Sequence, residues 1–231
     1  MNTNDSPTDA NSENAQNQDA GRTLVIGDIH GCASALELLL QEIALEPADT
    51  LVFLGDYVDR GSNSRGVLDI ILKLMETHHI VPLLGNHEIM MLDAVNETVM
   101  RDLWLHFGGQ QTIESYGGKF ENIPDEHLKF LRNCVRYYET DDHLFVHANY
   151  LPGKPLDEQE DQVLYWTHLL DFRPGPHCSG KRVIVGHTPQ TNGNILDFGH
   201  MVCIDTYCFG GGKLTAMDVQ SNEIWQTSEK P

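Results

Sequence analysis

Residues 51–61 read LVFLGDYVDRG, an apolar run of strand length that stops at glycine and is followed by two aspartates and an arginine. The same order occurs in residues 23–31, TLVIGDIHG, and in residues 81–88, VPLLGNHE. Short β-prone runs bounded by glycine are typical of buried strands. The recurrence of Asp or Asn directly after three such runs predicts that the strand ends carry function.

Helical patterns separate the three runs. The apolar residues that share a helix face are Leu36, Leu39, Leu40 and Ile43 in the first pattern and Val67, Ile70, Ile71 and Leu74 in the second. Alternation of strand and helix predicts an α/β fold with parallel pairing and right-handed crossovers. Functional crevices of open α/β sheets lie beyond the carboxyl ends of the strands. The polar residues of the three runs therefore belong to one crevice.

The chain turns to short strands after residue 141. Residues 144–146 stop at His147, residues 183–185 stop at Gly186 and His187, and further apolar runs cover residues 201–204 and 214–219. These runs predict a second sheet. Residues 100–136, between the two halves, are mostly helical in pattern with glycine-rich breaks, and we expect them to form a cap beside the crevice.

The composition fits a single globular domain behind a polar tail. Hydrophobic residues make up 40% of the 231 residues and charged residues 21%, an ordinary balance for a chain long enough to bury one core. Residues 1–20 are rich in Asn, Gln, Asp and Glu and hold almost nothing that could pack. We predict a disordered tail over residues 1–20 and one domain over residues 21–228.

Charge and hydropathy exclude two classes of partner. The net charge of −19, from 34 acidic and 15 basic residues, repels nucleic-acid phosphates and attracts cations. No run approaches the roughly 20 apolar residues of a membrane helix, and the N-terminus lacks the pattern of a secretory signal. Five scattered cysteines indicate free thiols. We expect a cytoplasmic protein that binds neither nucleic acid nor membrane; oligomeric state is left open.

Six polar residues at the strand ends form a candidate ligand set for metal ions. They combine carboxylate, amide and imidazole donors without thiolate: Asp28, His30, Asp56, Asn86, His147 and His187. Such a set suits Mn, Fe or Zn. Asp28 and His30 stand two apart, so on an extended chain both side chains point the same way. Two ions about 3.5 to 4 Å apart that share Asp56 would clamp a phosphoryl group and activate a water for in-line attack on phosphorus.

Taken singly, each segment fits a simpler explanation equally well. Asp28 could end a strand as any polar residue does, Asp59 and Arg60 could form a surface ion pair, and His147 and His187 could be satisfied core histidines. Only the recurrence of the pattern at five strand ends favours a metal site.

Residues next to the ligands are candidates for catalysis. His87 adjoins Asn86 and must point elsewhere, and a histidine beside a metal site is a candidate general acid because histidine titrates near neutral pH. Arg60, in the loop after Asp56, can form bidentate hydrogen bonds with phosphate oxygens.

The three motifs together resemble the phosphoprotein phosphatase branch of the calcineurin-like metallophosphoesterases. The signatures of that branch, Gly-Asp-x-His-Gly, Gly-Asp-x-Val-Asp-Arg-Gly and Gly-Asn-His-Glu, are complete and in order here. The resemblance covers about residues 23–219, including the later motifs around His147 and His187. It implies a sandwich of two mixed β-sheets flanked by helices.

The resemblance also implies a role for each site residue. Asp28, His30 and Asp56 would hold one metal ion, and Asp56, Asn86, His147 and His187 would hold the other. His87 would protonate the leaving oxygen, Asp59 would orient His87, and Arg60 and Asn86 would contact the phosphate. The implied cofactor is a pair of divalent ions, Mn first, with Fe or Zn as alternatives.

One departure from the family pattern concerns phosphate binding. Members commonly carry a second phosphate-binding arginine two residues after a tryptophan, whereas Trp166 is followed by Thr167 and His168. Either His168 or Arg173 would take over that contact, or phosphate binding is weaker.

The implied activity is metal-dependent phosphoester hydrolysis, with two substrate classes in competition. The segments 104–117 and 205–216 look like those of small bacterial members, which include serine/threonine protein phosphatases and symmetrical diadenosine tetraphosphate hydrolases. We expect a phosphorylated protein rather than a small phosphoester, because we find no segment that clearly supplies a pocket for two nucleotides. A phosphate-binding protein without turnover is a further interpretation, suggested by the missing arginine.

Overall fold

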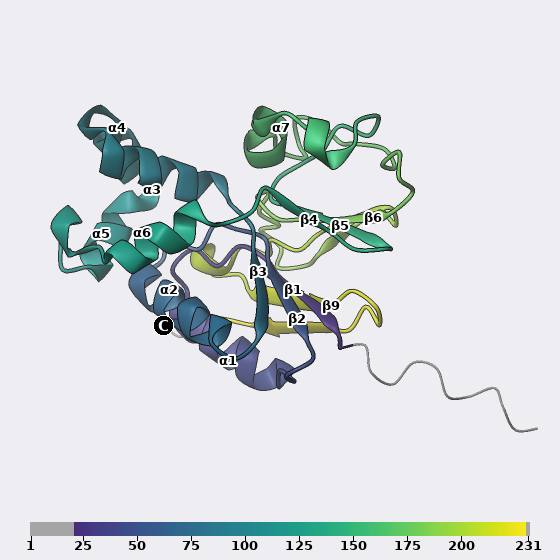
Figure 1. Cartoon of the computed structure of the whole chain (residues 1–231), viewed down its shortest axis with the longest axis horizontal. Helices are drawn as coiled ribbons and strands as arrows, with labels where there is room; N and C mark the ends of the chain where they lie inside the picture. The colour runs from purple at the N-terminus through teal and green to yellow at the C-terminus, as the bar shows by residue number, and fades with distance from the viewer. Residues whose placement is uncertain (1–20, 230–231) are drawn as a thin grey trace, which may run out of the picture.

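The computed structural model of the protein describes residues 21–229, so the tail predicted for residues 1–20 lies outside the described residues. Two five-stranded sheets form its centre (Figure 1). The first has the order β10-β9-β1-β2-β3, with β1 (Thr23–Ile26), β2 (Thr50–Phe53), β3 (His79–Pro82), β9 (Leu214–Asp218) and β10 (Ile224–Thr227). The second has the order β4-β5-β6-β8-β7, with β4 (Tyr137–Glu139), β5 (His143–Val146), β6 (Arg182–Val185), β7 (Leu196–Asp197) and β8 (Met201–Cys203).

Both sheets are mixed around a parallel centre. Strands β1, β2 and β3 run parallel, as do β5, β6 and β8, whereas β9, β10, β4 and β7 pair antiparallel. The predicted α/β fold of two mixed sheets flanked by helices is therefore confirmed. Within each sheet the parallel strands bring their carboxyl ends to one edge, and the loops that follow them meet there.

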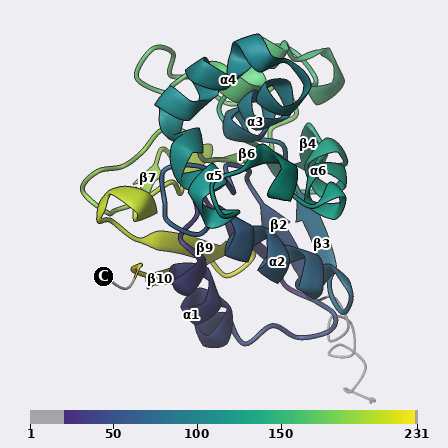
Figure 2. The same ribbon diagram turned by 90° about the vertical axis from the view of Figure 1, so that its left-hand side faces the viewer.

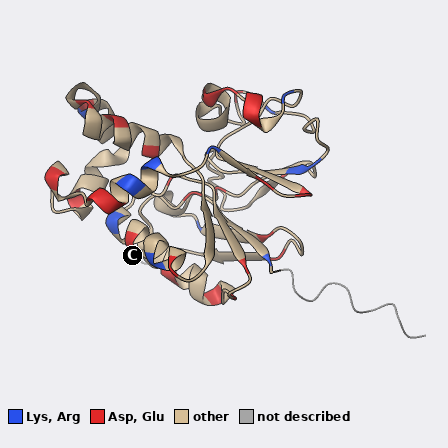
Figure 3. Ribbon diagram, viewed as in Figure 1, with Lys and Arg blue, Asp and Glu red and all other residues tan. Residues whose placement is uncertain are grey.

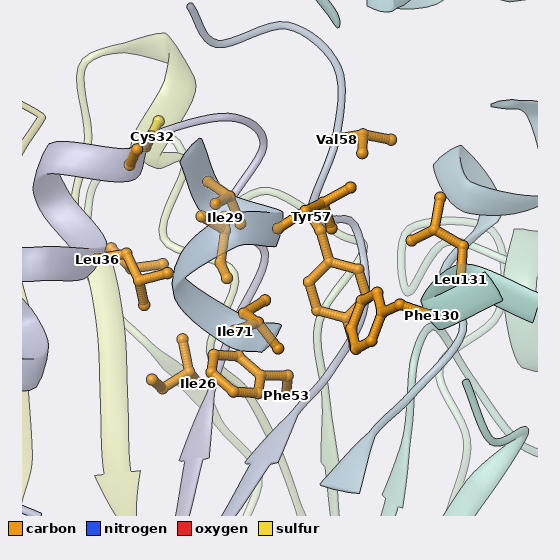
Figure 4. Packing of buried hydrophobic residues seen from close by; sticks show 14 of the residues in the cluster. Ile26, Ile29, Cys32, Leu36, Phe53, Tyr57, Val58, Ile71, Phe130 and Leu131 are labelled. Atoms are coloured by element: carbon orange, nitrogen blue, oxygen red, sulfur yellow. The ribbon is translucent and has the colours of Figure 1, made fainter. Parts of the chain in front are cut away.

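Alternation along the central strands divides the apolar side chains between two faces. Val25 and Val52 point toward the second sheet and pack with Phe145 and Ile184 between the sheets. The residues on either side of Val25 and Val52 in β1 and β2 face the opposite way, toward α1 (Ala33–Ile43) and α2 (Ser64–Met75). They are Leu24, Ile26, Leu51 and Phe53. Figure 4 shows Ile26 and Phe53 of neighbouring strands beneath Ile71 of α2. Each such side chain stabilises the fold by about 1.5–3 kcal/mol when fully buried.

Helices that follow β3 gather on one side of the sheets (Figure 2). They are α3 (Asn86–Asn96), α4 (Thr98–Trp104), the π-helical turn η1 (Leu105–Gly109), α5 (Gln110–Ser115), the 3-10 turn η2 (Phe120–Asn122) and α6 (Asp125–Arg132). The helical prediction for residues 100–136 is confirmed. The second sheet is covered on its outer face by η3 (Leu156–Glu158) and α7 (Asp161–Trp166), and η4 (Cys208–Gly210) precedes β9.

Some elements differ from the sequence prediction. Strand β3 lies two residues earlier than predicted, and Leu83 beyond it forms an isolated bridge with Val135. Helix α3 was not predicted, because residues 85–88 were interpreted only as a strand end. Its start is fixed by Glu88, whose carboxylate accepts a hydrogen bond of 3.0 Å from the Gly85 amide. The short strands β4, β7 and β10 were also missed.

Acidic residues are spread over the helices and loops of both halves, with fewer lysines and arginines among them (Figure 3). Within residues 21–229 no helix has the length and apolar content needed to cross a bilayer. All five cysteines are free, as predicted.

Candidate active site

The loops after the parallel strands converge on the carboxylate of Asp56. Nε2 of His30 lies 3.4 Å from one oxygen of Asp56, and Nε2 of His147 lies 3.5 Å from the other. The side-chain oxygen of Asn86 is 3.0 Å from both Nε2 of His147 and Nδ1 of His187. Residues from the loops after β1, β2, β3, β5 and β6 thus meet in one buried cluster.

The imidazoles of this cluster present lone pairs to Asp56. Nδ1 of His30 is 2.9 Å from the carbonyl oxygen of Val58, and Nδ1 of His147 is 2.8 Å from that of Leu54. A carbonyl oxygen only accepts, so each Nδ1 donates and each Nε2 is left unprotonated in the neutral ring. Burial lowers the pKa of His30 and His147 and lowers that of His187 to about 3. Neutral imidazole is the form that binds metal ions.

Two groups of side chains in the described chain could each hold a metal ion. His30, Asp56 and His87 form one, and Asp56, His147 and His187 form the other, with donor atoms within 4.8 Å of one another in each group. Nε2 of His187 is buried and has no hydrogen-bond partner among residues 21–229. The shared Asp56 and the oxygen and imidazole donors fit a pair of divalent ions bridged by one carboxylate.

Asp28 and Asp205 add negative charge beside this cluster. The carboxylate of Asp28 accepts hydrogen bonds of 3.1 and 3.0 Å from the His187 amide. Burial, followed by repulsion from Asp205 and Asp56, raises the pKa of Asp28 well above its usual value, and burial raises that of Asp205 to about 7. Such a concentration of buried carboxylates favours a bound cation. Asp205 was not among the predicted site residues, although it follows the apolar run 201–204 as the other candidates follow theirs.

The extended conformation expected for Asp28 to His30 is wrong. His30 has φ of 46° and Gly31 has φ of 66°, so a turn, not strand alternation, aims the imidazole at Asp56. Of the eight non-glycine residues with positive φ in residues 21–229, five belong to the candidate site: His30, Asp56, Asp59, Arg60 and His187. L-residues rarely adopt this region, and strained backbone of this kind clusters at functional sites.

His87 is held by a buried aspartate. Nδ1 of His87 lies 2.7 Å from Oδ2 of Asp59, which also accepts a 2.8 Å bond from the indole of Trp104. Oδ1 of Asp59 accepts a 2.7 Å bond from the hydroxyl of Thr112. Burial raises the pKa of Asp59, and these hydrogen bonds oppose the rise. Trp104 and Thr112 had no assigned role at the sequence level, and they fix the Asp59–His87 pair.

Glu88 fixes the backbone on which Asp56 sits. Its carboxylate accepts amide hydrogen bonds of 2.8 Å from Asp56, 2.8 Å from Tyr57 and 3.3 Å from Val58. Burial raises the pKa of Glu88 to about 8. The three polar residues of the third motif therefore have different roles, because Asn86 joins the ligand cluster, His87 pairs with Asp59, and Glu88 supports the second motif.

Arg60 lies at the mouth of the cluster. Its Nη1 is 2.8 Å from Nε2 of His30, and its guanidinium stacks 4.7 Å above the ring of Phe209. A metal ion at Nε2 of His30 would use the same lone pair, so Arg60 and the ion exclude each other there. If an ion at His30 displaced it, the Arg60 guanidinium would be free to bind an anion at the mouth of the cluster.

A cavity of about 280 Å³ opens above the cluster. Its lining includes Asp56, Arg60, Asn86, His87, Phe107, Trp166, His168 and His187. The ring of His168 is tilted against that of His187 with centroids 4.3 Å apart. Arg173 does not line this cavity; it lines an adjoining one of about 460 Å³, which shares His168 and Pro189 with the first. Of the two residues considered for the missing arginine, only His168 reaches the cavity above Asp56.

Comparisons with known proteins agree with this arrangement. The model of the calcineurin-like phosphoesterase family matches residues 21–211. Serine/threonine-protein phosphatase 1 of Salmonella typhimurium is 32% identical over 85% of this chain and 91% of its own. The symmetrical bis(5'-nucleosyl)-tetraphosphatase of Pseudomonas fluorescens is 27% identical over 87% and 89%. A crystal structure assigned provisionally to a diadenosine tetraphosphatase superposes with a TM-score of 0.69 at 24% identity, covering 90% of this chain and 93% of the other, which supports the fold alone.

Proposed function

The chain belongs to the calcineurin-like phosphoesterases, which are hydrolases of phosphoester bonds, and from this premise we propose that it is a metal-dependent serine/threonine protein phosphatase. The observation that supports the chemistry is the pair of ligand groups sharing Asp56, with the Asp59–His87 pair beside them. A metal pair next to a positioned imidazole is suited to direct transfer of the phosphoryl group to water.

Two divalent ions, held by Asp28, His30 and Asp56 on one side and by Asp56, Asn86, His147 and His187 on the other, would supply Lewis acidity to phosphate and water. Oxygen and imidazole donors suit manganese, iron and zinc. We propose manganese first, with iron or zinc as alternatives. His87 groups with His30 and Asp56 and could therefore also bind the first ion. We assign it to proton transfer because Asp59 holds its Nδ1–H, which leaves Nε2 to carry the proton for the leaving oxygen.

Arg60 and Asn86 would orient the phosphoryl group. Arg60 can donate two parallel hydrogen bonds to its oxygens, and the Phe209 ring supports the plane of the guanidinium. Asn86, after the neighbouring parallel strand β3, lines the same cavity, and His168 lines it beside His187. These contacts would hold phosphorus in line with the attacking water.

A row of exposed apolar side chains that ends at the catalytic cavity supports the proposal of a polypeptide substrate. Val99, Leu103 and Phe107 follow one another at four-residue intervals on α4 and η1, with exposed fractions of 80%, 50% and 47%. Phe107 also lines the cavity above Asp56. Exposed apolar residues in a row are unusual on a monomer and suit side chains that flank a phosphoserine or phosphothreonine. The second candidate is hydrolysis of diadenosine tetraphosphate, which the Pseudomonas relative favours.

We also propose that the protein is cytoplasmic and does not bind nucleic acid. A net charge of −19 disfavours nucleic acid as a partner, and nothing in the composition requires a location other than the cytoplasm.

The test compares substrates on one preparation. Purified protein with added manganese is assayed with a phosphothreonine peptide, diadenosine tetraphosphate and an aryl phosphate, and Asp56→Asn, nearly isosteric but uncharged, serves as the control. We expect peptide hydrolysis with the higher kcat/KM, and for Asp56→Asn a rate at least about 10³-fold lower together with reduced metal content by mass spectrometry. Exclusive turnover of the dinucleotide would replace the protein substrate with the second candidate, and inactivity with manganese, iron and zinc would refute hydrolysis.

A further inference from the structure

The cavity adjoining the catalytic one shares His168 and Pro189 with it and has two walls. One wall is the segment from Thr188 to Asn192, which directly follows His187. The other is the turn from His168 to Arg173, joined to the first wall by a 3.0 Å hydrogen bond from the Leu169 amide to the Thr188 hydroxyl. The buried side chain of Asn149 holds this turn by donating to the carbonyl oxygens of Thr167 and Phe172, at 3.3 and 2.8 Å.

The lining of this cavity has an unusual charge. Acidic residues outnumber basic ones by 34 to 15 in the chain, yet among residues 21–229 no carboxylate lines this cavity. The lining consists of His168, Leu169, Leu170, Arg173, Thr188, Pro189, Gln190, Thr191, Asn192 and Leu196. Arg173 is therefore the one permanent charge among them, and it is positive.

Arg173 is also presented in a way that leaves its donors available. Its guanidinium stacks on the ring of Phe198 at 4.5 Å, and within residues 21–229 it forms no ion pair and no hydrogen bond. Arg22, Arg136 and Arg182, by contrast, each pair with an aspartate. Stacking orients the planar group while its N–H bonds remain free, which is how arginine recognises carboxylate and phosphate.

We propose that this cavity binds a second anionic group of the substrate, next to the phosphate undergoing hydrolysis, and that Arg173 recognises it. The inference rests on the proposed hydrolysis at the adjoining metal site. The volume of about 460 Å³ lies in the range of small-ligand sites. The shared chemistry is a carboxylate or phosphate; its source is either an acidic residue beside the phosphorylated one in a protein or a further phosphate of a nucleotide polyphosphate.

The experiment measures how strongly the enzyme prefers substrates that carry a second anionic group. The holoenzyme and Arg173→Gln are assayed on two phosphothreonine peptides that differ only by Glu or Gln beside the phosphothreonine, on diadenosine tetraphosphate, and on an aryl phosphate with no second anion. Arg132→Gln, an exposed arginine on α6 outside both cavities, is the matched control for loss of one positive charge.

We expect Arg173→Gln to lower the ratio of kcat/KM for the doubly charged substrate to that for the aryl phosphate by about three- to tenfold, since a charge-assisted hydrogen bond is lost at a partly exposed site. The effect should shrink at high salt, and Phe198→Leu should give a smaller loss. Loss confined to the Glu peptide identifies a protein anion, and loss confined to the dinucleotide identifies a phosphate. An unchanged ratio in both arms, or an equal change in Arg132→Gln, overturns the inference while hydrolysis of the aryl phosphate still stands.

Discussion

The two sides of the catalytic cavity are built very differently. On the His87 side, Asp59 is fully buried and both of its oxygens accept hydrogen bonds, from His87, Trp104 and Thr112. On the other side, His168 is half-buried, and in the adjoining cavity that His168 also lines, Arg173 is exposed and Leu170 has an exposed fraction of 89%. The first side fixes atoms for chemistry, whereas the second offers side chains that can adapt to a ligand.

This difference in construction separates the rate of the reaction from the choice of substrate. A side chain held by a buried, satisfied network keeps its geometry whatever the substrate, because every alternative position leaves a polar group unpaired. Exposed side chains on a turn lose little when they move or are replaced. We infer that changes on the His87 side alter rate for all substrates, and that changes on the His168 side alter the choice among them.

The largest effect that this comparison predicts is that of His87→Asn. Asparagine retains a polar group near Asp59 but cannot transfer a proton, so kcat should fall by about 10²- to 10⁴-fold for every substrate. Metal content, measured by mass spectrometry, should remain at the wild-type level. A protein that loses one ion in this variant would place His87 among the metal ligands, as its distance to His30 and Asp56 also permits.

A smaller effect is expected from the positioning residue Trp104. In Trp104→Phe the buried Asp59 loses one donor, which should raise its pKa further and loosen its hold on His87. We expect kcat to fall about tenfold with KM unchanged, together with a loss of about 1–3 kcal/mol in the free energy of unfolding. Thr112→Val removes the hydroxyl that donates to Oδ1 of Asp59, with little change of volume, and should act in the same direction. If KM rises instead while kcat is kept, Asp59 does not act through His87.

The smallest effect concerns a contact that belongs to neither side. Helix α1 has no side-chain cap from Cys32; instead the carboxylate of Glu229, near the end of the chain, accepts hydrogen bonds of 2.9 Å from the Ala35 amide and 2.6 Å from the Ser34 hydroxyl. Glu229→Ala should lower the free energy of unfolding by about 1 kcal/mol in urea titrations and leave kcat and KM unchanged. A matching loss of kcat would show that global stability, not local geometry, limits the rate, and the comparison of the two sides would fail.

Sequence reasoning reached the strands and the ligand cluster because both rest on local signals. Short continuous apolar runs, each followed by a glycine or directly by a polar residue, indicate where β1, β2, β5 and β6 end, and parallel pairing then gathers the polar residues at one edge. Asp205 carried the same signal and could have been found. Of the partners of Asp59, His87 was predicted, but the other two could not be, since Trp104 and Thr112 are 45 and 53 residues away along the chain, and no periodicity connects them. Tertiary contacts between a loop and a later helix become visible only in the fold.

The left-handed backbone at His30, Asp56, Asp59, Arg60 and His187 has a consequence for how this protein can be engineered. Glycine adopts that conformation without the cost of about 1–3 kcal/mol that each strained residue carries. A selection that rewards only soluble expression or heat resistance would therefore enrich glycine at these positions and relieve the crowding of buried carboxylates, at the expense of turnover. Thermostable variants obtained without an activity screen are thus biased toward inactive protein, and consensus or library designs should keep these five positions fixed.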